Sequence, residues 1–326
     1  MAGSAGPPAT APAEDLPSGA SWRRAAVSGL FVVLAVLAFA RALSGRWTEI
    51  ARQLAAQEPA VLVVALATAV CGVFMSFLLW RGTLAFLGTR LGVAIAARLF
   101  FVTQLGKYLP GAIWPVLAQM RTGRMMGIPR QRMGLAFLLT LGLATLVGFF
   151  VGFLALPALL RAEGPLVLLG LLALPLFVVV LVPSVLNALL ARALAVLGRP
   201  AMDRQVRGND VVRGVAWSLA FWVVYGAHVW LLAVSLGAPP VQTLPVAIGG
   251  FAVAFGVGPL LVVLPAGAGV REAVLVVVLS SVLSTADATV VALTSRVLLM
   301  LADGLLAAGS VVAARRARPP VLTSGA

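Results

Sequence analysis

Successive apolar stretches of about twenty residues, separated by short arginine-rich loops, most constrain the fold of this chain. A helix of that length crosses the ~30 Å hydrocarbon core of a bilayer, where only helices and closed barrels satisfy their own backbone hydrogen bonds. The chain is 61% hydrophobic and only 10% charged, a balance foreign to soluble globular domains. The gaps between the stretches are too short for a soluble domain. We therefore expect an all-α integral membrane protein whose function lies in the membrane.

The hydropathy pattern predicts about eight transmembrane helices plus one re-entrant hairpin, with helices broken by proline and glycine in two pseudo-repeated halves. Both flanks of the hairpin, Leu99–Met120, are basic, so a straight span would place one basic flank outside the cell. Leucines at helical spacing over Ser184–Gly198 predict a short interfacial helix. The expected spans are residues 25–40, 59–79, 133–156, 165–182, 215–236, 244–264, 270–283 and 288–313.

The placement of arginine predicts that both termini face the cytoplasm. The densest basic loop, Arg121–Arg132, and the terminal cluster, Arg315–Arg318, then lie on the cytoplasmic side, as the positive-inside rule requires. This bias accounts for the formal net charge of +14, so the charge does not indicate a nucleic-acid partner. Abundant arginine, alanine, glycine and proline indicate a GC-rich bacterial genome, and hence the bacterial inner membrane.

Composition also predicts the domain organisation. Residues 1–21 are rich in alanine, proline, serine and glycine, which predicts a disordered tail. Residues 22–314 form one transmembrane domain, and residues 315–326 form a basic cytoplasmic tail. Ala38-Phe39-Ala40 resembles a small-x-small cleavage site, so removal of the first hydrophobic segment as a signal peptide stays open.

Two apolar stretches, roughly half the chain apart, are broken by proline and glycine and carry charge at membrane depth. Such paired breaks point to a transporter's binding site, because freed backbone groups and charges find polar partners only inside protein or in a wet cavity. The first break contains Pro110 and Gly111 and follows Lys107. Gln104 lies one helical turn before Lys107, so we expect both to face one cavity. Trp114 either lines that cavity or is an ordinary interfacial aromatic residue.

The second break contains Pro265, Gly267 and Gly269 and is followed by Arg271 and Glu272. A helix that restarts after such a break presents free backbone N–H groups and the positive end of its dipole, which together bind anions. The glycines also allow a headgroup to approach the backbone closely. Close helix packing through small residues is the alternative explanation for them.

The last span adds Arg296 and Asp303, seven residues apart on one helix face. A charge at mid-membrane costs roughly 2.5 to 3.5 kcal/mol on insertion scales, so partners are required. We expect Glu272 to pair with Arg296 or Lys107, and Asp303 to pair with Arg296. Three interpretations are open. The charges are structural ion pairs that lock the spans together, or Lys107, Arg271 and Arg296 bind an anionic headgroup, with Glu272 as a gate or a proton-coupled partner. In the third, Arg271 is not at membrane depth and extends to the cytoplasmic surface.

The sequence favours no enzyme and no cofactor. Cys71 and His228 are single residues of their kind, which provides no disulfide framework and no metal site. The glycine-rich second break lacks the Lys-Ser/Thr that follows a nucleotide-binding loop. We identify no catalytic set of side chains.

Three of these features resemble the flippase-like family called the lysylphosphatidylglycerol synthase transmembrane region. They are Lys107-Tyr-Leu-Pro-Gly111 preceded by Gln104, the string Leu264–Glu272, and Arg296 in the next span. The resemblance covers about residues 20–315. It implies about eight helices and movement of charged phospholipids or polyisoprenyl-linked sugars between leaflets. The second break reads Pro-Ala-Gly where the family pattern has Pro-Gly-Gly. Some members carry a cytosolic aminoacyl transferase domain, which is not seen in this chain, so lysyl transfer is not expected.

The functional expectation is a flippase or exporter of an anionic or zwitterionic lipid, with membrane lipids as its partners. One alternative is a membrane partner that organises a separately encoded glycosyltransferase or lipid synthase through the basic loop Arg121–Arg132. Another is an intramembrane lipid-modifying enzyme that uses Lys107 and Glu272.

Overall fold

The structure is a computed structural model that describes residues 57–108, 113–157, 160, 179–196, 198, 204–257 and 269–316. All regular secondary structure in these ranges is helical. The elements are α3 (Pro59–Phe86), α4 (Val93–Gln104), η1 (Leu105–Tyr108), α5 (Trp114–Met125), α6 (Arg130–Gly152), η2 (Phe153–Ala155), α10 (Pro183–Val196), α11 (Gly208–Ser235), α12 (Pro240–Val257), α13 (Val270–Leu279) and α14 (Thr285–Arg316).

Four helices in the described ranges are long and apolar enough to cross a membrane: α3, α6 with η2, α11 and α14. They correspond to the predicted spans at 59–79, 133–156, 215–236 and 288–313. The chain is therefore an all-α protein of the multi-pass membrane type. The predicted span at 25–40, almost all of the span at 165–182, and both terminal tails lie outside the described residues.

The first broken stretch is a pair of short helices that pack against each other. The helices α4 and α5 have 12 residues each, about 18 Å of helix, which is too short to cross the bilayer. A Cβ on Gly106 would lie 3.2 Å from Trp114 Cβ, so glycine there lets η1 approach the start of α5. At the other end, Arg132 Nη1 in the first turn of α6 donates to Thr89 Oγ1 (3.1 Å) in the connection from α3 to α4.

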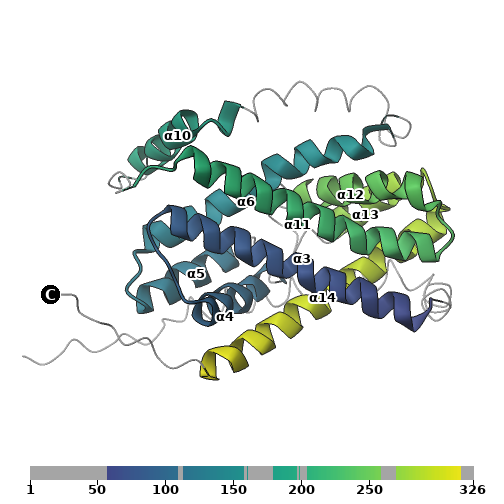
Figure 1. The fold of residues 1–326 in the computed structure, drawn as a ribbon, viewed down its shortest axis with the longest axis horizontal. Helices are drawn as coiled ribbons and strands as arrows, with labels where there is room; N and C mark the ends of the chain where they lie inside the picture. The colour runs from purple at the N-terminus through teal and green to yellow at the C-terminus, as the bar shows by residue number, and fades with distance from the viewer. Residues whose placement is uncertain are drawn as a thin grey trace, which may run out of the picture.

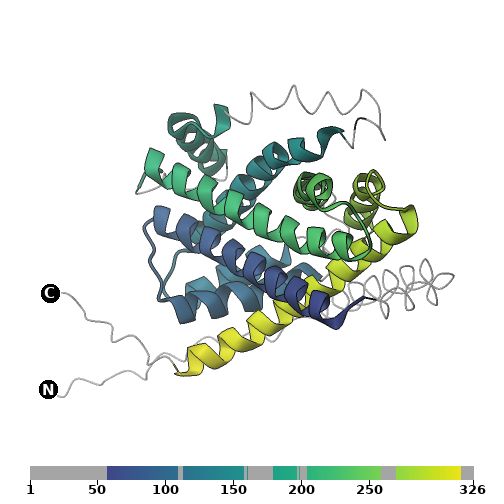
Figure 2. The ribbon, with the colours of Figure 1, turned by 45° about the vertical axis from the view of Figure 1, so that its right-hand side comes forward.

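The second broken stretch has the same form. The helix α13 has only 10 residues, about 15 Å, and packs beside α12, as Figure 2 shows. This corrects the expectation of a separate span at 270–283. The cause is a run of serines: Ser280 and Ser281 bond to the last carbonyls of α13, and Ser284 caps the start of α14 by accepting from the Asp287 N–H (3.1 Å).

The two broken pairs belong to two structural repeats. In the order α3, α4, α5, α6 and the order α11, α12, α13, α14, a long helix is followed by two short ones and a second long helix. The contacts correspond as well, because α14 packs on α4 as α6 packs on α12, and α5 packs on α6 as α13 packs on α14. In Figure 1, α3 and α11 run antiparallel. The ends at which α4 and α5 join the long helices lie opposite the ends at which α12 and α13 join theirs. The repeats are therefore inverted.

Small residues bring the two repeats together along α3 and α11. A Cβ on Gly72 of α3 would lie 2.6 Å from the ring of Tyr225 on α11. Within the second repeat, a Cβ on Gly226 of α11 would lie 2.3 Å from the Cα of Ile248 on α12, so these two helices also approach closely. Such contacts are typical of membrane helices, where close backbone approach replaces the hydrophobic driving force. The result is a tightly packed centre where α3, α11 and α12 meet.

Candidate functional site

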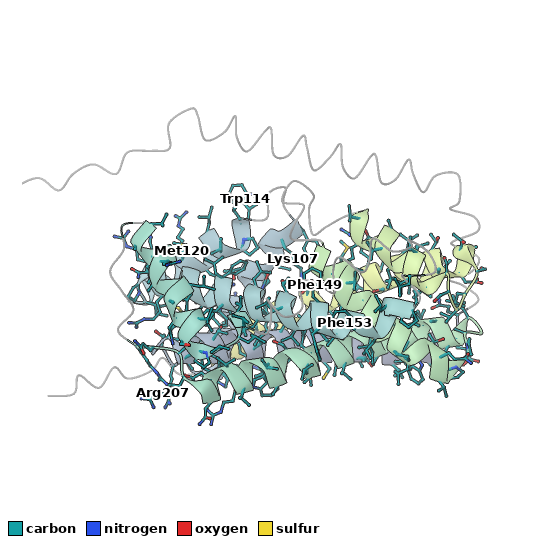
Figure 3. The ribbon with its side chains drawn as sticks, turned by 90° about the horizontal axis from the view of Figure 1, so that it is seen from above. Lys107, Trp114, Met120, Phe149, Phe153 and Arg207 are labelled. Carbon is teal, nitrogen blue, oxygen red and sulfur yellow. The ribbon has the colours of Figure 1, made fainter. Side chains whose placement is uncertain are left out.

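Two residues of η1, just before the first break, reach the middle of α14. Lys107 Nζ lies 2.6 Å from Asp303 Oδ2, and the Tyr108 hydroxyl donates to the same oxygen (2.5 Å). Asp303 is only 4% exposed, so its charge is met by one cation and one phenol. In Figure 3, Lys107 lies in the middle of the long axis, whereas Arg207 lies at one end. The first break therefore places charge at the centre of the bundle.

The second break reaches the same helix through Glu272. The Gly269 N–H donates to Glu272 Oε2 (2.6 Å), which caps the start of α13. Arg296 Nη1 of α14 lies 2.5 Å from Glu272 Oε1. Gly269 has φ +86°, a conformation that favours glycine, so the chain can turn sharply just before the cap. One carboxylate thus starts a helix and links it to α14.

Both breaks therefore find their counter-charges on one helix. Arg296 and Asp303 are two turns apart, about 10.5 Å along the axis of α14. The expected pair of Glu272 with Arg296 is present. The expected pair of Asp303 with Arg296 is wrong, because side chains seven residues apart on one helix are too distant for a salt bridge, and Asp303 pairs with Lys107 instead.

Arg271 is the cation of this site for which the described residues show no salt bridge. Its guanidinium lies over two aromatic rings of α12, with Cζ 4.6 Å from the Phe251 centroid and 5.3 Å from the Phe255 centroid. Aromatic faces attract such a cation and orient its planar fork. The three cations and two carboxylates of the described site leave one positive charge, and Arg271 carries it.

The remaining predicted site residues are not brought together at one place by the described part of the structure. Gln104 is half-buried and ends α4, one turn from Lys107. Trp114 begins α5, is 38% exposed and projects from the described helices in Figure 3. The other predicted site residues lie outside the described ranges: Pro110, Gly111, Pro265 and Gly267.

Sequence reasoning missed the role of Tyr108. A tyrosine beside Lys107 carries no signal that its hydroxyl will bind an aspartate 195 residues further on.

His228 behaves as a packed, hydrogen-bonded histidine: Nδ1 contacts the Tyr225 carbonyl and Nε2 lies 2.8 Å from Ser295 Oγ. Because a carbonyl only accepts, Nδ1 carries the proton and the serine hydroxyl donates to Nε2. Among the described residues, no group of three or more His, Cys, Asp or Glu is placed to hold a metal.

Long apolar helices, together with two inverted pairs of short helices that are each tied to α14 by an ion pair, are features of a multi-pass membrane protein. The family model described as the lysylphosphatidylglycerol synthase TM region matches residues 26–307, and the chain belongs to that family. The match includes every helix from α3 to α13 and most of α14. A comparison with curated proteins finds no match.

Proposed function

We propose that this protein moves a lipid with an anionic or zwitterionic headgroup between the leaflets of the bacterial inner membrane. The substrate class is a phospholipid or a polyisoprenyl-linked lipid, and no chemical bond is made or broken. Both termini lie in the cytoplasm in this proposal, and the paired helices α4 and α5 form a re-entrant hairpin that enters from that side. The helices α12 and α13 form its counterpart from the outer side.

The convergence of both breaks on α14, with one surplus positive charge at Arg271, is the observation that carries this proposal. A phosphodiester bears one negative charge and accepts two parallel hydrogen bonds from a guanidinium. The pairs Lys107–Asp303 and Arg296–Glu272 neutralise the other four charges. The site therefore fits one phosphate, while acyl chains stay in the bilayer.

The inverted repeats support alternating access to that site. In transporters built this way, substrate lies near the midplane between repeats, and one repeat rocks against the other. The Lys107–Asp303 pair joins the first repeat to the second, and it is the contact that such rocking would exchange. The energy source in this proposal is an ion gradient, the membrane potential or the lipid gradient.

The test is lipid movement in proteoliposomes by Arg271→Gln, with Arg207→Gln as the matched control. Arg207 is also an arginine, but it is exposed at one end of the molecule. Loss of a charge-assisted bidentate contact should slow the exposure of headgroup-labelled phosphatidylglycerol at least about tenfold. The control should match the wild type, and Arg271→Lys should keep part of the rate. An unchanged rate in folded Arg271→Gln protein would remove the central claim.

A second proposal concerns the end of α5 and the start of α6. Arg121 and Arg124 in the last turns of α5 and Arg130 at the start of α6 are exposed, and Met125, the last residue of α5, is 82% exposed. Basic residues around an exposed apolar side chain suit a protein partner, here a separately encoded membrane glycosyltransferase or lipid synthase. Alanine at the three arginines should then abolish the activity of the partner glycosyltransferase or lipid synthase in cells, while lipid movement by the purified protein is unchanged. Loss of both would assign these arginines to transport itself.

A further inference from the structure

A cavity lies at the arginine-rich end of the described molecule, away from the site on α14. Its volume is about 330 Å³, and it is bounded by the end of α3, the connection to α4 and the start of α11. Four arginines line it: Arg81, Arg90, Arg204 and Arg213. None of them belongs to the transport site proposed above.

The carboxylate in this cavity is already engaged. Asp210 Oδ2 lies 3.6 Å from Arg204 Nη2 and accepts the backbone N–H of Arg207 (3.1 Å), which caps α11. One cation is thus neutralised. For Arg81, Arg90 and Arg213 the structure describes no carboxylate partner among the residues that it places. The cavity therefore carries an excess of positive charge.

The donors of these arginines are poised for an acceptor. Arg81 Nε donates to the Leu91 carbonyl (3.4 Å), which anchors the side chain across the connection and leaves its terminal nitrogens available. Arg204 Nε is buried with no hydrogen-bond acceptor among the described groups. Buried donors in native proteins are nearly always satisfied, so this one points to an acceptor that the described residues do not supply.

The rest of the cavity is apolar. Leu78 and Phe86 of α3 form part of its wall, and Trp217 of α11 stands beside it, 37% exposed. Tryptophan is enriched at the level of lipid headgroups. An arginine rim next to an apolar wall matches a molecule with a phosphate at one end and hydrocarbon at the other, whereas a free phosphate would make no use of the wall.

We propose that this cavity binds the phosphate of an anionic phospholipid at the cytoplasmic surface, as a site separate from the transport site. Basic pockets between membrane helices on that side bind lipid headgroups. The guanidinium groups contact the phosphate oxygens, and the acyl chains follow the wall formed by α3. The lipid joins the first repeat to the second, because Arg81 belongs to α3 and Arg213 to α11.

The test is a titration of phosphatidylglycerol onto the purified full-length protein in zwitterionic detergent, read by native mass spectrometry. Arg81→Gln/Arg213→Gln is compared with Arg315→Gln/Arg316→Gln, which removes the same charge from the exposed end of α14. We expect the first variant to lose one bound lipid, with at least a tenfold weaker apparent affinity, and the control to match the wild type. Equal loss in both variants, or in neither, would overturn the proposal.

Three further arms separate the alternatives. Arg271→Gln should keep this lipid, so failure of the transport proposal leaves this one testable. If the double variant fails to fold, Arg90→Gln takes its place in the test. It removes one exposed charge at the rim of the cavity and should weaken phosphatidylglycerol binding severalfold. Inorganic phosphate in place of lipid should bind no tighter to the wild type than to Arg81→Gln/Arg213→Gln. Selective phosphate binding that displaces phosphatidylglycerol would reassign the cavity to free phosphate.

Discussion

Asp303 is the most confined charge of the described site, with Lys107 Nζ and the Tyr108 hydroxyl both within 2.6 Å of one carboxylate oxygen. The two partners differ in their access to water: Lys107 is 31% exposed at its side chain and Asp303 is 4% exposed. A lysine that loses its partner can turn toward water, but a buried aspartate cannot. The pair is therefore asymmetric in what its disruption costs.

We expect Lys107→Gln to lower the free energy of unfolding by about 3 kcal/mol, the low end for breaking a buried ion pair, because Tyr108 still donates to Asp303. Asp303→Asn should cost less, and Lys107→Gln/Asp303→Asn should recover part of the loss. Thermal unfolding of all three in one detergent closes the double-mutant cycle. Strictly additive losses would show that the two residues do not interact.

Gly269 permits a second prediction at the residue scale. Its φ of +86° is strained for any residue with a Cβ, at a cost of about 1–3 kcal/mol. We expect Gly269→Ala to destabilise the protein and to weaken the hydrogen bond between Gly269 N–H and Glu272. Gly304→Ala is the control, since Gly304 is helical and a Cβ there meets nothing within 4 Å. The control should be neutral or stabilising by up to about 1 kcal/mol, and unfolding temperatures compare the two.

Among the elements, the short helices decide where charge can reach. The helices α4 and α5 stay within contact because Gly106 adds no atoms between η1 and α5. The 10-residue α13 begins at the Glu272 cap and ends at Ser280. Each pair therefore extends only partway along the long helices. This is why Lys107 and Glu272 meet the middle of α14 rather than an end.

We expect Gly106→Ala to separate the arms of the first pair, because its Cβ would lie 3.2 Å from Trp114 Cβ and 3.3 Å from the backbone nitrogen of Pro115. Overpacking of this kind costs about 1–3 kcal/mol. Lipid movement should fall as Lys107 withdraws from Asp303. Gly92→Ala, where a Cβ meets nothing within 4 Å, is the control for both stability and transport. Equal effects of the two substitutions would contradict the packing argument.

The elements also show what the sequence could and could not predict. The four long spans follow from hydropathy, and the first short pair follows from its two basic flanks. The end of α13 was missed because Ser280 and Ser281 look like ordinary small residues until their hydroxyls bond to the helix carbonyls. The partner of Asp303 was missed because pairing across repeats depends on tertiary packing, which no local spacing encodes.

For the whole molecule, the inverted repeats give two mouths of opposite character. The connections from α11 to α12 and from α13 to α14 enclose a cavity of about 810 Å³ lined with serines, Gln242 and the single described acid Asp287. The other end carries the exposed arginines Arg121, Arg124 and Arg130. In the orientation proposed above, which follows the positive-inside rule, the mouth lined by Asp287 and without an arginine among its lining residues faces outward.

Orientation can be tested by cysteine labelling in intact spheroplasts. Cys71, the only cysteine of the chain, is first replaced by serine. Gln242→Cys should then react with a membrane-impermeant maleimide, while Arg124→Cys should react only after permeabilisation. The reverse pattern would invert the topology, and labelling of both without permeabilisation would exclude a bilayer between the two positions.

One helix holds the counter-charges for both broken pairs, and this has a consequence for control. A rotation of α14 about its own axis would separate Asp303 from Lys107 and Arg296 from Glu272 in the same step. The contacts of the two broken pairs would therefore open together. Arg315 and Arg316 are exposed at the end of that helix. A molecule that binds Arg315 and Arg316 on one side of the membrane could therefore change the ion pairs of both broken pairs at once.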